Sequence, residues 1–84
     1  MFNGIIKFTG KIFKIKKYKN EFYVSIRSNI KFTKAEIGSS VCCSGACLTL
    51  ESFNKKISNF YISKETINRT NFKFLNKNSI VNFE

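Results

Sequence analysis

Apolar and polar residues alternate with a period of two along much of the chain, a pattern typical of short, half-buried β-strands. Residues 22–27 show it most clearly, with Phe22, Val24 and Ile26 on one face and the polar side chains on the other. Similar alternation predicts further strands over residues 6–17, 38–53, 57–62 and 78–84, and the segment 38–53 is expected to form two strands that are separated near Gly45.

Turn residues and glycines separate these strands. The polar segments 16–21 and 54–56 are interpreted as hairpin connections. Gly10 is interpreted as a bend or bulge inside the first strand, because glycine in a strand interior often marks such an irregularity. The chain contains no proline and only four glycines, so no flexible linker divides it.

The periodicity changes after residue 62. Ser63 is a favourable N-cap, and Glu65 falls in the first turn, where the helix dipole favours a carboxylate, so we predict a short helix over residues 63–70. The charged centre of segment 28–37 indicates a further helical turn. Apolar residues of this segment are expected to plug one end of the fold: Ile30, Phe32 and Ile37. The loop at 71–77 is expected to return three more towards the core: Phe72, Phe74 and Leu75.

Six short strands with one or two short helices predict an all-β fold. Strands at this spacing build an all-β barrel, because they cannot build a parallel α/β sheet. The long connections favour a six-stranded barrel with Greek-key winding over a simple meander. The chain has 84 residues, so we expect a single domain, residues 1–84, whose small core gains stability from an oligomeric contact.

The formal net charge of +10 is compatible with a nucleic acid, an acidic membrane surface or an anionic ligand as partner. Arginine, the residue best suited to bidentate contacts with phosphates and bases, occurs only as Arg27 and Arg69. The lysines are spread over the whole chain. We therefore expect no nucleic-acid partner and no membrane partner, although a basic barrel that binds nucleic acid remains an alternative.

The cysteines are Cys42, Cys43 and Cys47, and the chain contains no histidine. A zinc site usually needs four Cys or His ligands, so no metal site is expected. An odd number of cysteines argues against a disulfide framework and for a reducing compartment. No apolar run approaches the roughly 18 residues of a membrane-spanning helix, and no signal peptide precedes the first motif. We expect a cytoplasmic protein.

Cys47 and Thr49 are two residues apart, so in a strand both side chains lie on the same face. The leucines that flank Thr49 then lie on the opposite face, where a core needs them. The core does not require the thiol or the hydroxyl, which makes both candidate functional groups. Cys42 and Cys43 are interpreted as residues that fill space in or near the core.

Four motifs resemble the N-terminal lumazine-binding barrel of riboflavin synthase, and the match is collinear from residue 1 to residue 84. They are Met1-Phe2-Asn3-Gly4-Ile5-Ile6, Ser40-Val41 followed by Gly45-Ala46-Cys47-Leu48-Thr49, Lys64-Glu65-Thr66-Ile67 followed by Thr70-Asn71, and Ser79-Ile80-Val81-Asn82-Phe83-Glu84. Each motif alone is weakly specific, whereas four in this order and spacing are specific. Two positions depart from the family pattern, because Ser44 stands where asparagine is usual and Asn3 where threonine is usual.

This resemblance implies a barrel that binds 6,7-dimethyl-8-ribityllumazine. Riboflavin synthase moves a four-carbon unit between two such lumazines, giving riboflavin and 5-amino-6-ribitylamino-uracil, without a cofactor. The family carries two similar barrels in one chain and assembles as a trimer, with each site shared between barrels of two subunits. The present chain matches the first barrel and lacks the second. A lone barrel is therefore expected to pair as a homodimer, with lumazine or riboflavin as its small-molecule partner.

The resemblance also implies the site residues. The substrate-binding positions are Gly4, Ile5, Ile6, Cys47, Leu48, Thr49, Tyr61, Ile62, Ser63, Lys64, Glu65 and Thr66. Cys47 and Ser40 are the candidates for a catalytic role, and Phe2 matches an aromatic residue near the site. Hydroxyls and exposed main chain at a barrel end suit a pteridine ring, which offers carbonyl and ring-nitrogen groups. A second interpretation is a lumazine- or flavin-binding protein that does not catalyse the reaction, because lumazine-carrying relatives of the family hold a chromophore that they do not convert.

Overall fold

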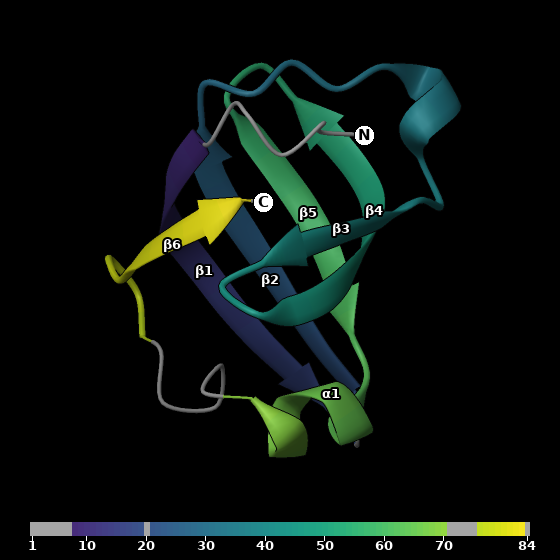
Figure 1. The fold of residues 1–84 in the computed structure, drawn as a ribbon, viewed down its shortest axis with the longest axis vertical. Helices are drawn as coiled ribbons and strands as arrows, with labels where there is room; N and C mark the ends of the chain where they lie inside the picture. The colour runs from purple at the N-terminus through teal and green to yellow at the C-terminus, as the bar shows by residue number, and fades with distance from the viewer. Residues whose placement is uncertain (1–7, 20, 71–75, 84) are drawn as a thin grey trace.

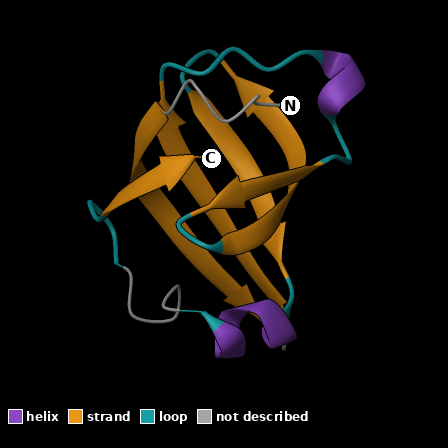
Figure 2. Cartoon of the chain, in the orientation of Figure 1, coloured by secondary structure: helices purple, strands orange, loops and turns teal. Residues whose placement is uncertain are grey.

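The alternating segments close into an antiparallel β-barrel in the computed structural model, which describes residues 8–19, 21–70 and 76–83 (Figures 1 and 2). Within these residues the barrel strands are β1 (Phe8–Tyr18), β2 (Glu21–Ser28), β3 (Ser40–Cys43), β4 (Ala46–Asn54), β5 (Ile57–Ile62) and β6 (Ile80–Phe83). The predicted all-β, six-stranded barrel is confirmed.

The order of strands around the barrel is β1-β2-β5-β4-β3-β6. Three hairpins supply the pairs β1–β2, β3–β4 and β4–β5, whereas β2–β5, β1–β6 and β3–β6 join strands that are distant in sequence. The long β2–β3 connection passes over one end of the barrel, as Greek-key winding requires (Figure 1).

The barrel interior holds the apolar half of each alternation. Phe60 on β5 is fully buried near its centre, with its ring centroid 6.0 Å from that of Phe32 and 5.9 Å from that of Phe83. The remaining core residues come from all six described strands, from the segment between β2 and β3 and from the helix that follows β5: Ile12, Val24, Ile26, Ile30, Val41, Cys43, Ala46, Leu48, Leu50, Ile62, Ile67 and Val81.

Of the bend or bulge predicted at Gly10, the bulge is absent, because Gly10 pairs regularly with Ser28 and Val81. A Cβ atom at this position would lie 2.6 Å from Ile26 Cγ2 and 2.9 Å from Phe83 Cε2. Glycine is therefore needed for the close approach of β1 to its neighbours. The irregularity lies further along, where the register of β1 against β2 shifts between Ile12 and Lys14.

Two short helices lie at the ends of the strands. The 3-10 turn η1 (Lys34–Glu36) begins where the main-chain N–H of Thr33 donates to Glu36 Oε1 at 2.8 Å, which confirms the helical turn predicted in segment 28–37. Ile30 and Phe32 are buried as expected, but Ile37 is 46% exposed and does not plug the barrel. The prediction that Ile37 plugs the barrel was wrong, because Ile37 follows η1 with its side chain facing outward.

Helix α1 (Lys64–Arg69) follows β5 and lies at the other end of the barrel (Figures 1 and 2). It packs against β2 and β4 and buries Ile67. The predicted return of Phe72, Phe74 and Leu75 to the core lies outside the described residues. No helix in residues 8–19, 21–70 and 76–83 has the length and apolar character that a membrane crossing requires.

Candidate functional site

Strand register brings four polar or aromatic side chains into one line across the outer wall of the barrel. Ser40 on β3 pairs with Thr49 on β4, Thr49 pairs with Tyr61 on β5, and Tyr61 pairs with Tyr23 on β2. Thr49 and Tyr61 each lie between two buried residues of their strands, and Ser40 and Tyr23 each precede a buried valine. The alternation along the strands therefore turns all four side chains outward. We call Ser40, Thr49, Tyr61 and Tyr23 the outer row.

The two tyrosines form the aromatic end of the outer row. Their ring centroids are 5.7 Å apart, with an interplanar angle of 58°. The Tyr23 hydroxyl donates to Glu21 Oε2 at 2.9 Å. This hydrogen bond raises the pKa of Tyr23, because the phenolate would lose the bond and face the carboxylate charge. The phenol therefore stays protonated and its ring stays oriented.

A second polar line runs beside the outer row on the same wall. Ser25 Oγ donates to Asn59 Oδ1 at 2.6 Å, and Asn59 Nδ2 donates to Ser52 Oγ at 3.0 Å. The chain of bonds joins β2, β5 and β4 across their outer faces. It fixes the amide and leaves the surface next to Tyr61 polar and ordered.

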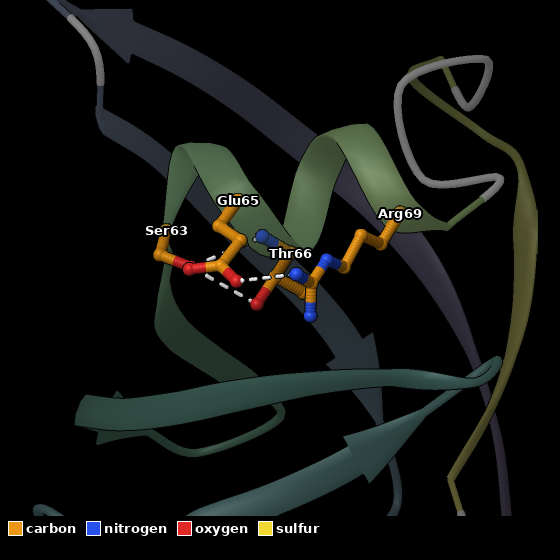
Figure 3. Close-up of polar contacts among 4 residues, drawn as sticks. All are labelled: Ser63, Glu65, Thr66 and Arg69. Atoms are coloured by element: carbon orange, nitrogen blue, oxygen red, sulfur yellow. Dashed lines mark hydrogen bonds and ion pairs between the residues drawn. The ribbon is translucent and has the colours of Figure 1, made fainter.

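The start of α1 adds two hydroxyls at the end of β5. Ser63 Oγ accepts a hydrogen bond from the Thr66 main-chain N–H at 3.1 Å, and it lies 2.9 Å from Thr66 Oγ1 (Figure 3). Ser63 is thus the N-cap that the sequence predicted. Ser63 follows the last residue of β5 directly, two residues beyond Tyr61.

Lys64 and Glu65 lie on the exposed side of α1. Glu65 Oε1 forms an ion pair with Arg69 Nη2 at 2.9 Å, one helical turn apart (Figure 3). Both side chains are largely exposed, so the pair contributes little to stability. The carboxylate is a helix-surface group here, and its ion pair competes with any contact to a ligand.

Cys47 lies two residues before Thr49 and shares its outward face, as predicted. Its cross-strand partner is Cys42, and both thiols are exposed and free. The prediction that Cys42 fills the core was wrong, because the alternation along β3 buries Val41 and Cys43 and turns Cys42 outward. Cys43 is fully buried, as expected.

Two of the predicted substrate-binding residues point away from this wall. Leu48 and Ile62 lie inside the barrel, with 0% and 1% of their surfaces exposed, so only their main-chain atoms can meet a ligand. Gly4, Ile5, Ile6 and Phe2 lie outside the described residues. The structure thus brings Ser40, Cys47, Thr49 and Tyr61 together on the outer face of β3, β4 and β5. Ser63 and Thr66 contact each other at the start of α1, directly after β5.

Tyr23, Asn59 and Cys42 belong to this wall and were not proposed as site residues. Alternation within each strand already predicted that Tyr23 faces outward. Its place beside Tyr61 depends on the pairing of β2 with β5, which are separated by two strands in sequence. No local signal in the sequence reports that pairing.

A pocket of about 610 Å³ is lined by residues of the β2–β3 connection and of the β4–β5 turn. Both segments lie at the opposite end of the barrel from α1 (Figure 1). The apolar wall of the pocket includes Ile30, Phe32 and Phe53, and exposed Lys31, Lys55 and Lys56 surround it. No predicted site residue lines it, so the candidate site remains the outer wall.

Replacing Ser63 with alanine is expected to lower the free energy of unfolding by about 1 kcal/mol, because the Thr66 N–H loses its cap. Urea unfolding followed by circular dichroism measures this change. Ser63→Asn should recover most of the loss. Ser39→Ala is the matched control, because this half-buried serine makes no side-chain hydrogen bond to the described residues. Equal losses in Ser63→Ala and Ser39→Ala would contradict the cap.

Comparison with known proteins shows the family of this chain. Residues 3–84 match the family model described as the lumazine binding domain. This chain belongs to that family. The predicted resemblance is therefore confirmed, and the outer row lies on a lumazine-binding-domain barrel.

Curated relatives of this lumazine binding domain are riboflavin synthases. That of Actinobacillus pleuropneumoniae is 34% identical over 84 residues, and that of Bacillus subtilis is 33% identical over 84 residues. The protein from Buchnera aphidicola subsp. Schizaphis graminum is 36% identical over 85 residues. All three alignments cover 100% of this chain but only 39%, 39% and 41% of the relatives, so the chain spans about two fifths of their length.

Solved structures of LumP superpose on the same domain. The complex with 6,7-dimethyl-8-(1'-D-ribityl) lumazine gives a TM-score of 0.75 at 29% identity. The complex with flavin mononucleotide gives 0.77 at 30% identity. Each match covers 100% of this chain and 48% of the LumP chain. A further LumP complex contains riboflavin, with a TM-score of 0.75.

Proposed function

We propose that this lumazine binding domain binds a ribityllumazine or a flavin on its outer wall, along the outer row and the start of α1. The observation that carries the proposal is the alignment of Ser40, Thr49 and Tyr61 across three strands. The hydroxyls of Ser63 and Thr66 follow at the start of α1, directly after β5. The bound lumazine, riboflavin and flavin mononucleotide in the LumP structures support this ligand class.

The chemistry of the wall matches the chemistry of the ligand. A lumazine or flavin ring has two apolar faces and an edge of carbonyl and ring-nitrogen groups, and its ribityl chain carries hydroxyls. Tyr61 and Tyr23 offer aromatic surface for a ring face. Ser40 and Thr49 offer hydroxyls to its polar edge, and Ser63 and Thr66 lie where the ribityl chain would extend.

We further propose a riboflavin synthase-type role for the bound ligand. The reaction joins two lumazines, one giving up a four-carbon unit and the other receiving it, and the outer wall holds one of them. A second barrel face, from another copy of this chain or from a partner barrel, is needed to hold the other in register. In this proposal Cys47 and Ser40 are the candidate catalytic groups, and the reaction uses no metal or cofactor.

The runner-up function is binding without conversion, which needs the same wall and no second barrel. In both cases we place the protein in a reducing, cytoplasmic setting. The two functions share the ligand and differ in the product, so a single experiment distinguishes them.

Fluorescence titration of the chain with 6,7-dimethyl-8-ribityllumazine is expected to saturate, and the affinity is expected to change less than about twofold between 50 and 200 mM salt. The lumazine is neutral, so no counterion release accompanies its binding. Chromatography of the same samples detects riboflavin if two faces cooperate. Binding without riboflavin would support the carrier function.

No saturation at either salt concentration would contradict the ligand site. A titration with single-stranded oligonucleotide is the matched comparison, because phosphate contacts weaken steeply over this salt range, by roughly a thousandfold or more for a large interface. Tight, salt-sensitive binding of the oligonucleotide alone would replace the proposal with the nucleic-acid alternative.

A further inference from the structure

We propose that Cys42 and Cys47 are a redox-modification site: the two exposed thiols close into a reversible disulfide across the β3–β4 hairpin. The bond would lie on the outer wall, because Cys42 is two residues from Ser40 in β3 and Cys47 is two residues from Thr49 in β4. The disulfide requires no bound group, because the strand register alone places Cys42 opposite Cys47.

The turn of the hairpin sets the geometry of the pair. Ser44 and Gly45 connect β3 to β4 with φ angles of 47° and 82°, both in the left-handed region that a tight two-residue hairpin turn of type I′ requires. Cys43 and Ala46 flank such a turn as its hydrogen-bonded closing pair. Cys42 and Cys47 are then the adjacent, non-hydrogen-bonded pair, in which side chains approach most closely.

Distances of this pair type suit a disulfide. The Cα atoms of a non-hydrogen-bonded antiparallel pair are about 4.5 Å apart, within the range of about 4.4–6.8 Å that disulfides span. Both thiols leave the same face, because their neighbours in both strands are buried: Val41, Cys43, Ala46 and Leu48. The strands need no change of register to bring the sulfur atoms together.

The remaining cysteine cannot substitute for either partner. Cys43 is adjacent to Cys42 but points into the barrel, with 0% of its surface exposed. Its paired residue across the hairpin is Ala46, which carries no thiol. The structure therefore selects one of the three pairings that three cysteines allow.

The reaction needs an external two-electron oxidant, and a small-molecule disulfide serves. One protein thiolate attacks a sulfur of the small disulfide, forms a mixed disulfide and releases one small thiol. The second protein thiolate then attacks the mixed disulfide at the protein sulfur and releases the other small thiol. Two protein thiols are oxidised to one disulfide, the small disulfide is reduced to two thiols, and excess thiol reverses both steps.

Ligand binding on the outer wall is expected to slow this closure. Cys47 lies on the same face as Thr49 and two residues from it, so a ring that covers Thr49 shields the thiol. This consequence rests on the proposed function, whereas the disulfide itself does not. The two are therefore tested by separate readouts.

The experiment treats the reduced chain with oxidised glutathione and measures its intact mass. The expected product has lost two hydrogen atoms and carries no glutathione. Trypsin cleaves after Lys34 and next after Lys55, so the peptide of residues 35–55 holds all three cysteines. Alkylation after unfolding should then modify only one of them. A product that keeps three alkylatable thiols, or only glutathione adducts, would overturn the proposal.

Variants assign the bond. Cys42→Ser and Cys47→Ser should each stop at a glutathione adduct, because the resolving thiol is missing. Cys43→Ala should still close, and its circular dichroism spectrum checks that it folds. Closure in Cys42→Ser, or failure of a folded Cys43→Ala to close, would refute the assigned pair.

Lumazine at saturating concentration should slow closure of the wild-type chain severalfold. Unchanged closure would place the ligand away from Cys47 and count against the proposed ligand face, while the disulfide would stand. Absence of the disulfide with normal lumazine binding would refute the redox site and leave the ligand face intact.

Discussion

Replacing Phe60 with alanine is expected to unfold most of the protein at room temperature. The ring is fully buried and contacts the rings of Phe32 and Phe83. Removing a buried phenylalanine side chain lowers the free energy of unfolding by about 3–5 kcal/mol. A domain of this size is stabilised by only a few kcal/mol, so the loss is comparable with its whole stability. Far-UV circular dichroism and urea unfolding measure it.

Two companion variants make the result interpretable. Phe60→Leu keeps an apolar side chain in the core and should remain folded, with a loss of about 1–2 kcal/mol. Phe13→Ala removes the same kind of ring from a site that is 44% exposed, where the ring centroid lies 5.5 Å from Arg27 Cζ. This variant should change the free energy of unfolding by less than about 1 kcal/mol. A Phe60→Ala protein as stable as Phe13→Ala would contradict the core assignment.

Substituting Thr49 with arginine is expected to weaken lumazine binding by more than about tenfold, which corresponds to about 1.4 kcal/mol. Thr49 lies between Ser40 and Tyr61 in the outer row, so a long charged side chain there covers the surface that the ring needs. The same fluorescence titration measures the change. Thr49→Val, which removes only the hydroxyl, should weaken binding by about 1 kcal/mol if that hydroxyl meets the ligand.

Thr9→Arg is the matched control for this series. Thr9 is an exposed threonine on β1, paired with Asn82 of β6 and outside the outer row. The substitution adds the same size and charge at another outward strand position, and lumazine affinity should not change. Equal weakening by Thr9→Arg and Thr49→Arg would indicate a general effect of charge and would remove the outer row as the binding surface.

The strands themselves could be predicted from local pattern, because inward and outward side chains alternate within each one. The N-cap at Ser63 and the hairpin connections at 16–21 and 54–56 were predicted on the same basis, since caps and tight turns depend on a few neighbouring residues. The exposed position of Cys47 beside Thr49 also follows from a spacing of two.

The predictions for Gly10 and Cys42 differ from the structure because the roles of these residues depend on contacts with other strands. Gly10 was interpreted from its residue type alone. The structure shows that glycine is needed there because Ile26 and Phe83 approach it closely from other strands. Cys42 resembles a core residue in a run of apolar neighbours, yet the phase of the alternation in β3 turns it outward. The phase is set by which neighbours are buried, and burial is a tertiary property.

The sequence by itself determined the all-β class, the hairpins, the capped helix and the family to which the chain belongs. The tertiary structure decided which outward residues become neighbours. β2 pairs with β5 and β3 pairs with β4 in registers that line up Tyr23, Tyr61, Thr49 and Ser40 and set Cys42 opposite Cys47. Local pattern specifies the face of each side chain, but only barrel closure with its register specifies the partner on the next strand.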